Sequence, residues 1–205
     1  MSLARVYPIV DSAAWIARLA PLGVRLVQLR IKDAPEDELL AQVRAARTLC
    51  SSAGIQLVVN DHWRIALAEG CDFVHLGQAD LDGADVGALR RAGVRVGIST
   101  HDRSELERAL EYQPDYVALG PIYPTLLKVM PWQPQGLARI GEWKRRSGTI
   151  PLVAIGGLTL ERLAGVFAAG ADAAAVVTDI VKAANPEGRA RQWLSAARAA
   201  ESAAA

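Results

Sequence analysis

The chain has 205 residues, of which 51% are hydrophobic, so it can bury one large core but is too short for two full-sized α/β domains. Its 23 Lys and Arg residues nearly balance its 22 Asp and Glu residues, which excludes an overall field that would attract nucleic acid or a lipid surface. We therefore expect a single domain over residues 1–205, with no nucleic-acid or membrane partner and with any anionic ligand bound by a local cluster of charges.

Cysteine content and the N-terminal segment indicate the compartment. Cys50 and Cys71 show no Cys-x-x-Cys spacing, which disfavours both a disulfide framework and a structural zinc site. The N-terminal segment lacks the basic region, apolar run and cleavage site of a signal peptide, and no apolar run reaches the length of about 18 residues that spans a bilayer. These features predict a cytoplasmic protein and leave its oligomeric state open.

Short apolar runs rich in β-branched residues alternate with longer segments of helical periodicity, a pattern typical of βα units around a parallel sheet. The segment from Glu38 to Ser51, for example, carries apolar residues at spacings of one, three and four, as one face of an amphipathic helix requires. Eight strands are predicted, each followed by a helix: Val6 to Val10, Leu26 to Arg30, Gln56 to Asn60, Phe73 to Leu76, Val94 to Ser99, Tyr116 to Leu119, Leu152 to Ile155, and Ala174 to Val177.

Several predicted helices end at a glycine that leads directly into the next strand, as at Gly54, Gly70, Gly93 and Gly170. Glycine suits the left-handed residue that ends such helices. Eight units in a chain of this length predict a (βα)₈ TIM barrel. An open doubly wound sheet is the alternative, but the segment after the first strand, Val10-Asp11-Ser12-Ala13, has no glycine of the dinucleotide-binding type.

Polar residues gather at the predicted strand ends, which meet at one rim of a parallel barrel. The second strand leads into Gln28-Leu29-Arg30-Ile31-Lys32, where strand alternation turns Gln28, Arg30 and Lys32 to one face. Unpaired cations facing inward are costly, so this arrangement favours an anionic ligand. A solvated edge strand is the alternative interpretation.

The third and fourth strands end near oxygen-bearing side chains. Asn60 and Asp61 close the third strand, and Asp80 follows the fourth. Carboxylate and amide oxygens are ligands that Mg²⁺ prefers, with waters and phosphate oxygens completing an octahedron. Asn-Asp is also common turn chemistry, and Asp80 has the type to cap the next helix. Beside the cations of the second strand, the three residues predict a metal and diphosphate site.

The later strand ends predict a phosphate-binding half of the rim. The seventh strand ends in Gly156-Gly157, and Thr178 follows the eighth; such positions commonly bind phosphate through backbone amides and a helix N-terminus. After the sixth strand comes a loop with Lys128, which has the length to reach an anion from above. The segment KVMPWQPQG within this loop is either a mobile surface segment or a lid. His75, inside the fourth strand, is better interpreted as a hydrogen-bonded interior residue than as a general base.

Taken in order, these segments resemble the motifs of the thiamine phosphate synthase family, from the second strand to the eighth. That family joins an aminopyrimidine bearing a methylene diphosphate to the ring nitrogen of a thiazole phosphate, forming thiamine phosphate and releasing pyrophosphate. The resemblance implies a Mg²⁺-dependent transferase with small-molecule substrates. The segments that carry it are QLRIKD, NDHWRIALAEG, VHLGQADL, VGISTHD, ALGPIYPT with Lys128, VAIGG and AVVTDI.

The resemblance also implies roles for individual residues. It implies that Asp61 and Asp80 ligate Mg²⁺. It implies a dissociative mechanism without a strong base, in which departing pyrophosphate is stabilised by the metal and by Arg30, Lys32 and Lys128. The residues implied to hold the pyrimidine diphosphate are Gln28, Leu29, Arg30, Ile31, Lys32, Asn60, Ser99 and Lys128. Those implied to surround the thiazole phosphate are Thr125, Leu126, Leu127, Gly157, Val177 and Thr178.

The chain departs from the family pattern at three places. Many relatives have Thr-x-Thr-Lys where this chain has Thr125-Leu126-Leu127-Lys128, so one hydroxyl expected near the thiazole is absent. Thr178 stands where Ser is usual and keeps a hydroxyl, and His62 stands where Arg is frequent. These changes affect the thiazole half and leave the diphosphate half intact.

Two other functions are consistent with the same scaffold. A related thiazole tautomerase binds a thiazole phosphate without joining it to pyrimidine, and it carries a histidine where Pro121 stands here. A non-catalytic sensor of a thiamine precursor is the other alternative. Arg30, Lys32, Asp61 and Asp80 favour the synthase over both.

Overall fold

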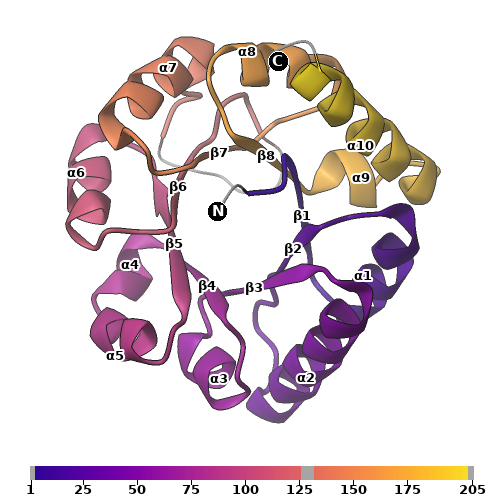
Figure 1. The fold of residues 1–205 in the computed structure, drawn as a ribbon, viewed down its shortest axis with the longest axis vertical. Helices are drawn as coiled ribbons and strands as arrows, with labels where there is room; N and C mark the ends of the chain where they lie inside the picture. Colours follow the sequence, from indigo (N-terminus) through magenta and orange to yellow (C-terminus); the bar gives the residue numbers. More distant parts are fainter. Residues whose placement is uncertain (1–2, 126–131, 203–205) are drawn as a thin grey trace.

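Eight parallel strands close into a barrel in sequential order, with β8 pairing back to β1. The computed structural model describes residues 3–125 and 132–202. In Figure 1 the strands lie at the centre and the helices form an outer ring around them. The strands are β1 (Val6–Val10), β2 (Leu26–Leu29), β3 (Gln56–Asn60), β4 (Phe73–Leu76), β5 (Arg95–Thr100), β6 (Tyr116–Leu119), β7 (Leu152–Ile155) and β8 (Ala173–Val176).

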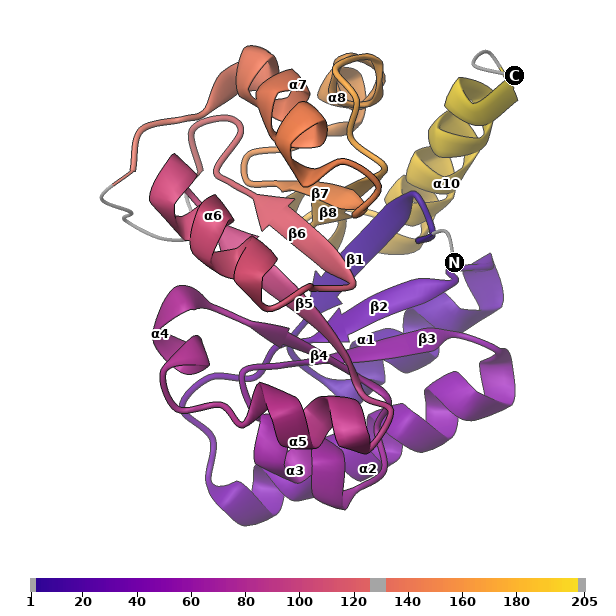
Figure 2. The ribbon, with the colours of Figure 1, turned by 60° about the vertical axis from the view of Figure 1, so that its left-hand side comes forward.

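Helices follow the strands and cover the outside of the barrel; in Figure 2, for example, α6 lies against β5. None of the helices in the described ranges combines the length and hydropathy needed to cross a bilayer. The α-helices are α1 (Ala13–Leu19), α2 (Glu36–Ala53), α3 (Trp63–Ala68), α4 (Gln78–Leu81), α5 (Val86–Arg91), α6 (Arg103–Glu111), α7 (Gly136–Ser147), α8 (Leu163–Ala168), α9 (Thr178–Val181) and α10 (Pro186–Ser202), with 3₁₀ turns η1 (Ala20–Leu22) and η2 (Leu160–Arg162).

The predicted (βα)₈ barrel is confirmed, and the differences are shifts at element ends. β2 ends at Leu29 rather than at Arg30. The backbone N–H of Arg30 still donates to the carbonyl of Val10, but Arg30 itself lies beyond the end of the strand. β5 and β8 are each displaced by one residue, to Arg95–Thr100 and Ala173–Val176. These shifts move no side chain to the other face of the sheet.

Helix α2 extends two residues beyond the predicted Glu38 to Ser51 at each end. Its first turn contains Glu36, Asp37 and Glu38, whose negative charges are stabilised at the positive end of a helix dipole. It ends at Gly54, which has a φ of 64° and donates its backbone N–H to the carbonyl of Cys50. The predicted glycine stop is therefore confirmed at this helix.

Strand alternation divides the interior into two cores. Outward-facing strand residues pack against the helices, together with the fully buried Trp143 and Trp193. Cys50 and Cys71 also lie there as free thiols, and burial raises the pKa of each to about 11. The inner core fills the barrel with Tyr7, Ile9, Leu26, Val58, Phe73, Tyr116, Ala118, Val153, Ala173 and Ala175.

A close contact between β5 and β6 lets a large ring enter the barrel. Gly97 pairs with Tyr116 across the two strands. A Cβ atom at Gly97 would lie 2.1 Å from Cζ of Tyr116, so only glycine leaves room for this ring. The Tyr116 hydroxyl is thereby directed into the barrel interior, beneath the rim.

Candidate functional site

A cavity of about 510 Å³ opens at the carboxyl ends of the strands, the end at which the sequence predicts the site. Every strand, or the segment just after it, contributes to its wall. Its lining is mixed: apolar residues of β1, β7 and β8 face a polar side formed by β2 to β5. The polar and glycine residues of the lining are Tyr7, Asp11, Gln28, Arg30, Lys32, Asn60, His75, Ser99, His101, Tyr116, Thr125, Gly156, Gly157 and Thr178.

The alternation predicted after β2 is confirmed. Gln28, Arg30 and Lys32 all line the cavity, from the 2% exposed Gln28 at depth to the exposed Lys32 at the rim. Leu29 is buried in the outer core and Ile31 packs against it, so neither of these side chains lines the cavity. The backbone of Ile31 instead holds His62, whose Nε2 lies 3.1 Å from the Ile31 carbonyl oxygen.

Asp80 and Arg30 lie close enough to Asp61 to change its pKa. Burial raises the pKa of Asp61, and the neighbouring Asp80 raises it further, whereas Asn60 and Arg30 lower it. Asp61 has a left-handed φ of 61°, which Asp tolerates better than most residues. Oδ2 of Asp80 accepts the backbone N–H of Gly77 at 3.1 Å, so the alternative capping role at the start of α4 is also present.

Asp61 and Asp80 are the residues that could hold a divalent cation. Across residues 3–125 and 132–202, no group of three or more His, Cys, Asp or Glu side chains gathers around one point. A raised pKa for a rim carboxyl signals that a positive charge beside it would stabilise its ionised form. A cation with two protein ligands and several water or phosphate ligands matches the coordination that Mg²⁺ adopts.

Asn60 contributes a further polar atom at depth. It is 3% exposed, and its Nδ2 has no hydrogen-bond acceptor within the described part of the chain, although it lies close enough to lower the pKa of Asp61. An unsatisfied buried donor is costly, and a ligand that accepts from it offsets that cost. Asn60 lines the cavity, so such a ligand would be reached from there.

A chain of hydrogen bonds crosses the barrel through residues that line the cavity. Nε2 of Gln28 donates to the Tyr7 hydroxyl at 3.0 Å, and the Tyr7 and Tyr116 hydroxyls are 3.0 Å apart. His75 lies between Tyr116, 2.7 Å from Nδ1, and Ser99, 2.8 Å from Nε2. Burial lowers the pKa of His75 to about 4, so the ring is neutral at pH 7. Both ring nitrogens have a hydrogen-bond partner, as expected for an interior histidine.

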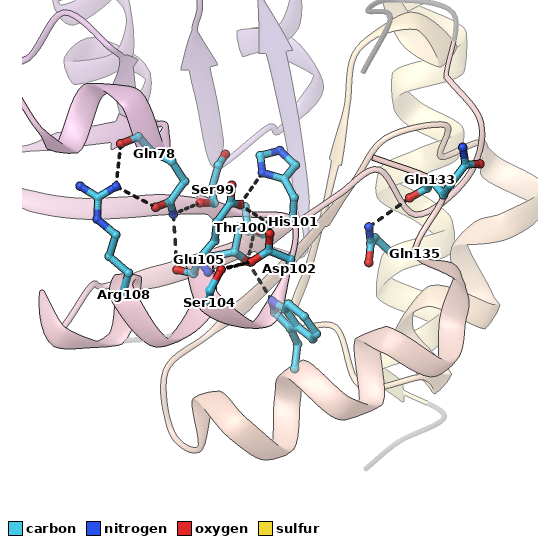
Figure 3. Close-up of polar contacts among 12 residues, drawn as sticks. Gln78, Ser99, Thr100, His101, Asp102, Ser104, Glu105, Arg108, Gln133 and Gln135 are labelled. Atoms are coloured by element: carbon cyan, nitrogen blue, oxygen red, sulfur yellow. Dashed lines mark hydrogen bonds and ion pairs between the residues drawn. The ribbon is translucent and has the colours of Figure 1, made fainter. Parts of the chain in front are cut away.

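The end of β5 is fixed by a second set of contacts, shown in Figure 3. Nε2 of Gln78 donates to the backbone carbonyl of Ser99 at 2.7 Å. His101 is held by Oε2 of Glu105, which lies 2.7 Å from both its backbone nitrogen and its Nδ1. On its other side, His101 stacks on Trp132 with ring centroids 3.9 Å apart. Trp132 therefore packs against a residue of the cavity wall.

The Gly156-Gly157 pair packs against the segment that follows β6. Both glycines have positive φ, 94° and 64°. A Cβ at Gly156 would lie 2.6 Å from Cα of Pro121, and one at Gly157 would lie 2.5 Å from the carbonyl oxygen of Pro124. The glycines are thus required by close backbone packing between two rim loops, a reason additional to the approach of a ligand.

We expect Gly157→Ala to destabilise the protein by roughly 2–5 kcal/mol, and Gly54→Ala by only about 1–2 kcal/mol. Both glycines have a φ of 64°, so both variants carry the strain of a left-handed alanine. Only at position 157 would the new methyl group also collide with backbone, because nothing lies within 4 Å of a Cβ at Gly54. Urea unfolding of the two variants measures the difference, and equal losses would contradict the packing argument.

The remaining predicted residues divide into two sets. Thr125, Val177 and Thr178 line the cavity together with Gly157, with Thr178 at the start of α9. Leu126, Leu127 and Lys128 lie outside the described residues, as do residues 128–131 of the segment KVMPWQPQG.

Sequence reasoning did not single out Tyr7, Tyr116 or Asp11, all of which line the cavity. A signal for the two tyrosines was available. Both occupy inward positions of their strands, and a glycine within β5, at Gly97, indicates that something large approaches there.

Comparison with known proteins adds a family assignment. Residues 6–180 match the family model described as thiamine monophosphate synthase. A thiamine-phosphate synthase from Rhizobium etli is 60% identical over 196 residues, covering 96% of each chain. One from Cronobacter sakazakii is 45% identical over 192 residues, covering 94% of this chain and 91% of that protein. The solved structure of a thiamine phosphate pyrophosphorylase from Pyrococcus furiosus has the same fold, with a TM-score of 0.83, 24% identity and 96% of each chain covered.

Proposed function

Since the chain belongs to the thiamine monophosphate synthase family and is a transferase, we propose that its rim cavity carries out a Mg²⁺-dependent condensation of two small phosphorylated substrates. One is 4-amino-2-methyl-5-(diphosphooxymethyl)pyrimidine, and the other is 4-methyl-5-(2-phosphooxyethyl)thiazole or its carboxylated form. The products are thiamine phosphate and pyrophosphate, and CO₂ is released as well when the carboxylated thiazole reacts. The observation that carries the proposal is the Asp61 and Asp80 carboxylate pair, which lies outside the cavity lining itself but next to Arg30 and Asn60, two residues of the cavity wall.

The cations after β2 and the amide of Asn60 suit the diphosphate. Arg30 offers a planar fork of donors that matches phosphate oxygens, and Lys32 adds a mobile point charge at the rim. Asn60 offers a buried N–H that lacks an acceptor among the described residues. These three residues would hold the diphosphate where charge accumulates on the leaving oxygen.

Asp61 and Asp80 would hold the metal. When bound there, Mg²⁺ supplies positive charge to the diphosphate and thereby favours its departure. The two carboxylates would fix the position of that charge near Arg30, whose own positive charge lowers the pKa of Asp61. Lys128 is proposed to complete this half from the loop after β6.

The chemistry that these residues support is a dissociative substitution. Arg30 and Lys32 stabilise negative charge as the carbon–oxygen bond to the diphosphate breaks, leaving a pyrimidine-stabilised methylene cation. The thiazole nitrogen then forms the new bond to that carbon. No residue has to remove a proton, which agrees with a His75 that is neutral and fully hydrogen-bonded.

The other side of the cavity is proposed to orient the thiazole phosphate. Thr125 and Thr178 offer hydroxyl groups, and Gly157 and Val177 offer backbone at the cavity wall. Leu126 and Leu127 belong to the same proposed subsite. Holding the thiazole close to the reacting carbon makes the second step effectively intramolecular.

Free phosphorylated substrates and two free thiols both favour a reducing cytoplasm as the site of action.

The experiment that tests the function mixes the full chain with both substrates and follows pyrophosphate and thiamine phosphate with and without Mg²⁺. We expect both products in equal amounts, and none after chelation of the metal. Thiazole conversion without coupling would indicate a tautomerase, and binding without turnover would indicate a sensor; either result contradicts the proposal.

A further inference from the structure

We propose that a one-directional hydrogen-bond chain in the wall of the cavity makes Ser99 a hydrogen-bond donor toward the substrate and holds His75 as its Nε2–H tautomer. The inference rests on the proposed function, because the acceptor is taken to be the pyrimidine diphosphate. The chain starts at Gln28 on β2, passes through Tyr7 on β1, Tyr116 on β6 and His75 on β4, and ends at Ser99 on β5.

The direction is set at the first member. Nε2 of Gln28 donates to the Tyr7 oxygen, so this oxygen is an acceptor and the Tyr7 hydrogen needs an acceptor of its own. The hydroxyls of Tyr7 and Tyr116 are 3.0 Å apart, and the two residues are 1% and 0% exposed. At such burial an unsatisfied hydroxyl hydrogen is costly.

With the amide nitrogen of Gln28 facing Tyr7, one order satisfies every hydroxyl of the chain. If Tyr116 donated to Tyr7, the Tyr7 hydrogen would have no acceptor within residues 3–125 and 132–202. If Tyr7 donates to Tyr116, the Tyr116 hydrogen is directed to Nδ1 of His75 at 2.7 Å. A neutral imidazole carries one N–H, so the proton is then on Nε2, which donates to the Ser99 oxygen at 2.8 Å.

The consequence appears at the cavity wall. Because His75 supplies the hydrogen of its bond to Ser99, the hydroxyl hydrogen of Ser99 is available to the cavity that this residue lines. At the other end, Gln28 uses its amide nitrogen for Tyr7 and presents its carbonyl oxygen as an acceptor. The cavity therefore offers a donor and an acceptor whose orientation is fixed before the substrate arrives.

Packing around the rings prevents the chain from relaxing. The Tyr116 ring occupies the space beside Gly97, where a Cβ would lie 2.1 Å from it. His75 stacks on Tyr116 with centroids 5.5 Å apart, and Tyr7 meets Tyr116 edge-on with centroids 6.0 Å apart. His75 and Tyr116 act on the substrate through Ser99 and are positioning residues.

The first test reads the tautomer directly. In protein labelled with ¹⁵N-histidine, the His75 signals are identified by their loss in His75→Gln, and the proton is expected on Nε2 at pH 7. A proton on Nδ1 would overturn the inference. The measurement needs no turnover, so this failure is distinct from a failure of the proposed function, which would appear as absence of thiamine phosphate.

The second test asks whether Tyr116 acts through Ser99. Tyr116→Phe removes one hydrogen-bonding group and is expected to lower kcat/KM about tenfold. In a double-mutant cycle, Tyr116→Phe should add no further loss to Ser99→Ala, because the end of the chain is already absent. Additive losses would overturn the inference.

Thr100→Val is the matched control, since Thr100 follows Ser99 in β5, is buried and makes side-chain hydrogen bonds of its own. Its Oγ1 donates to the carbonyl of Ala118 at 2.9 Å and accepts from Nε1 of Trp143 at 2.8 Å, on the outer face of β5. We expect a lower melting temperature with kcat/KM within about twofold of the parent. A tenfold loss in this variant would mean that any buried hydrogen bond of β5 has the same effect, and would overturn the inference.

Discussion

Asp61→Asn is expected to lower kcat at least about 100-fold while raising the free energy of unfolding of the metal-free protein. The first effect follows from loss of a metal ligand. The second follows because burial and Asp80 raise the pKa of Asp61, so that its ionised form destabilises the folded state at neutral pH. That cost shrinks as the pH falls through the raised pKa, so the stability gain in the variant should shrink with it. Steady-state rates with Mg²⁺ and urea unfolding in a chelator measure the two effects.

Asp33→Asn is the control for this prediction. Asp33 also follows a strand at the rim and also has a left-handed φ, 58° against 61° for Asp61, but it is exposed. Asn tolerates this backbone region, so neither variant introduces backbone strain. Asp33→Asn should leave both quantities close to those of the parent. Full activity in Asp61→Asn would remove Asp61 from the metal site, and a joint loss of activity and stability would indicate a structural role instead.

Arg30→Ala is expected to lower kcat/KM for the pyrimidine diphosphate by about 10²–10³. Arg30 is half-buried at the cavity wall, and its positive charge lowers the pKa of both Asp61 and His75, so its field covers the region where the diphosphate is proposed to leave. A guanidinium also binds phosphate oxygens through two donors at once, so Arg30→Lys should recover only part of the loss. Initial rates at varied pyrimidine diphosphate give the value.

Arg25→Ala provides the comparison, at the other end of the same strand. Arg25 is exposed and lies just before β2, at the opposite end from Arg30. Removing it changes the net charge by the same amount but leaves the cavity unaltered. Activity close to that of the parent is expected. Similar losses in both variants would show that overall charge, rather than a local contact, governs the rate.

Most of the fold could be predicted because each unit carries its own signals. Runs of β-branched residues predicted the strands, and glycines that end helices, such as Gly54, predicted the helix ends. The errors are one- or two-residue shifts, as at Leu29 and Glu36, where hydrogen bonding and charge at an element end decide the boundary. Resemblance to the thiamine phosphate synthase family, read from ordered motifs, is confirmed by the family match over residues 6–180.

The candidate site was predictable where strand alternation determines direction. It placed Gln28, Arg30 and Lys32 in one cavity, and the same rule excludes the side chains of Leu29 and Ile31.

Contacts between distant segments could not be read in this way. The chain from Gln28 to Ser99 joins five strands, and the packing of Gly157 against Pro124 joins two loops. Both depend on how the barrel closes, which local sequence patterns do not predict. The roles of Leu126, Leu127 and Lys128 stay predictions from the family pattern.

The central claim is that Asp61 and Asp80 hold a metal beside a diphosphate, and a crystal grown with Mn²⁺ and pyrophosphate tests it most directly. Mn²⁺ accepts the same oxygen ligands as Mg²⁺ and gives an anomalous signal that locates it. We predict one anomalous peak between the two carboxylates, with pyrophosphate contacting Arg30 and the metal. A peak elsewhere, or pyrophosphate bound with no metal at Asp61 and Asp80, would contradict this account.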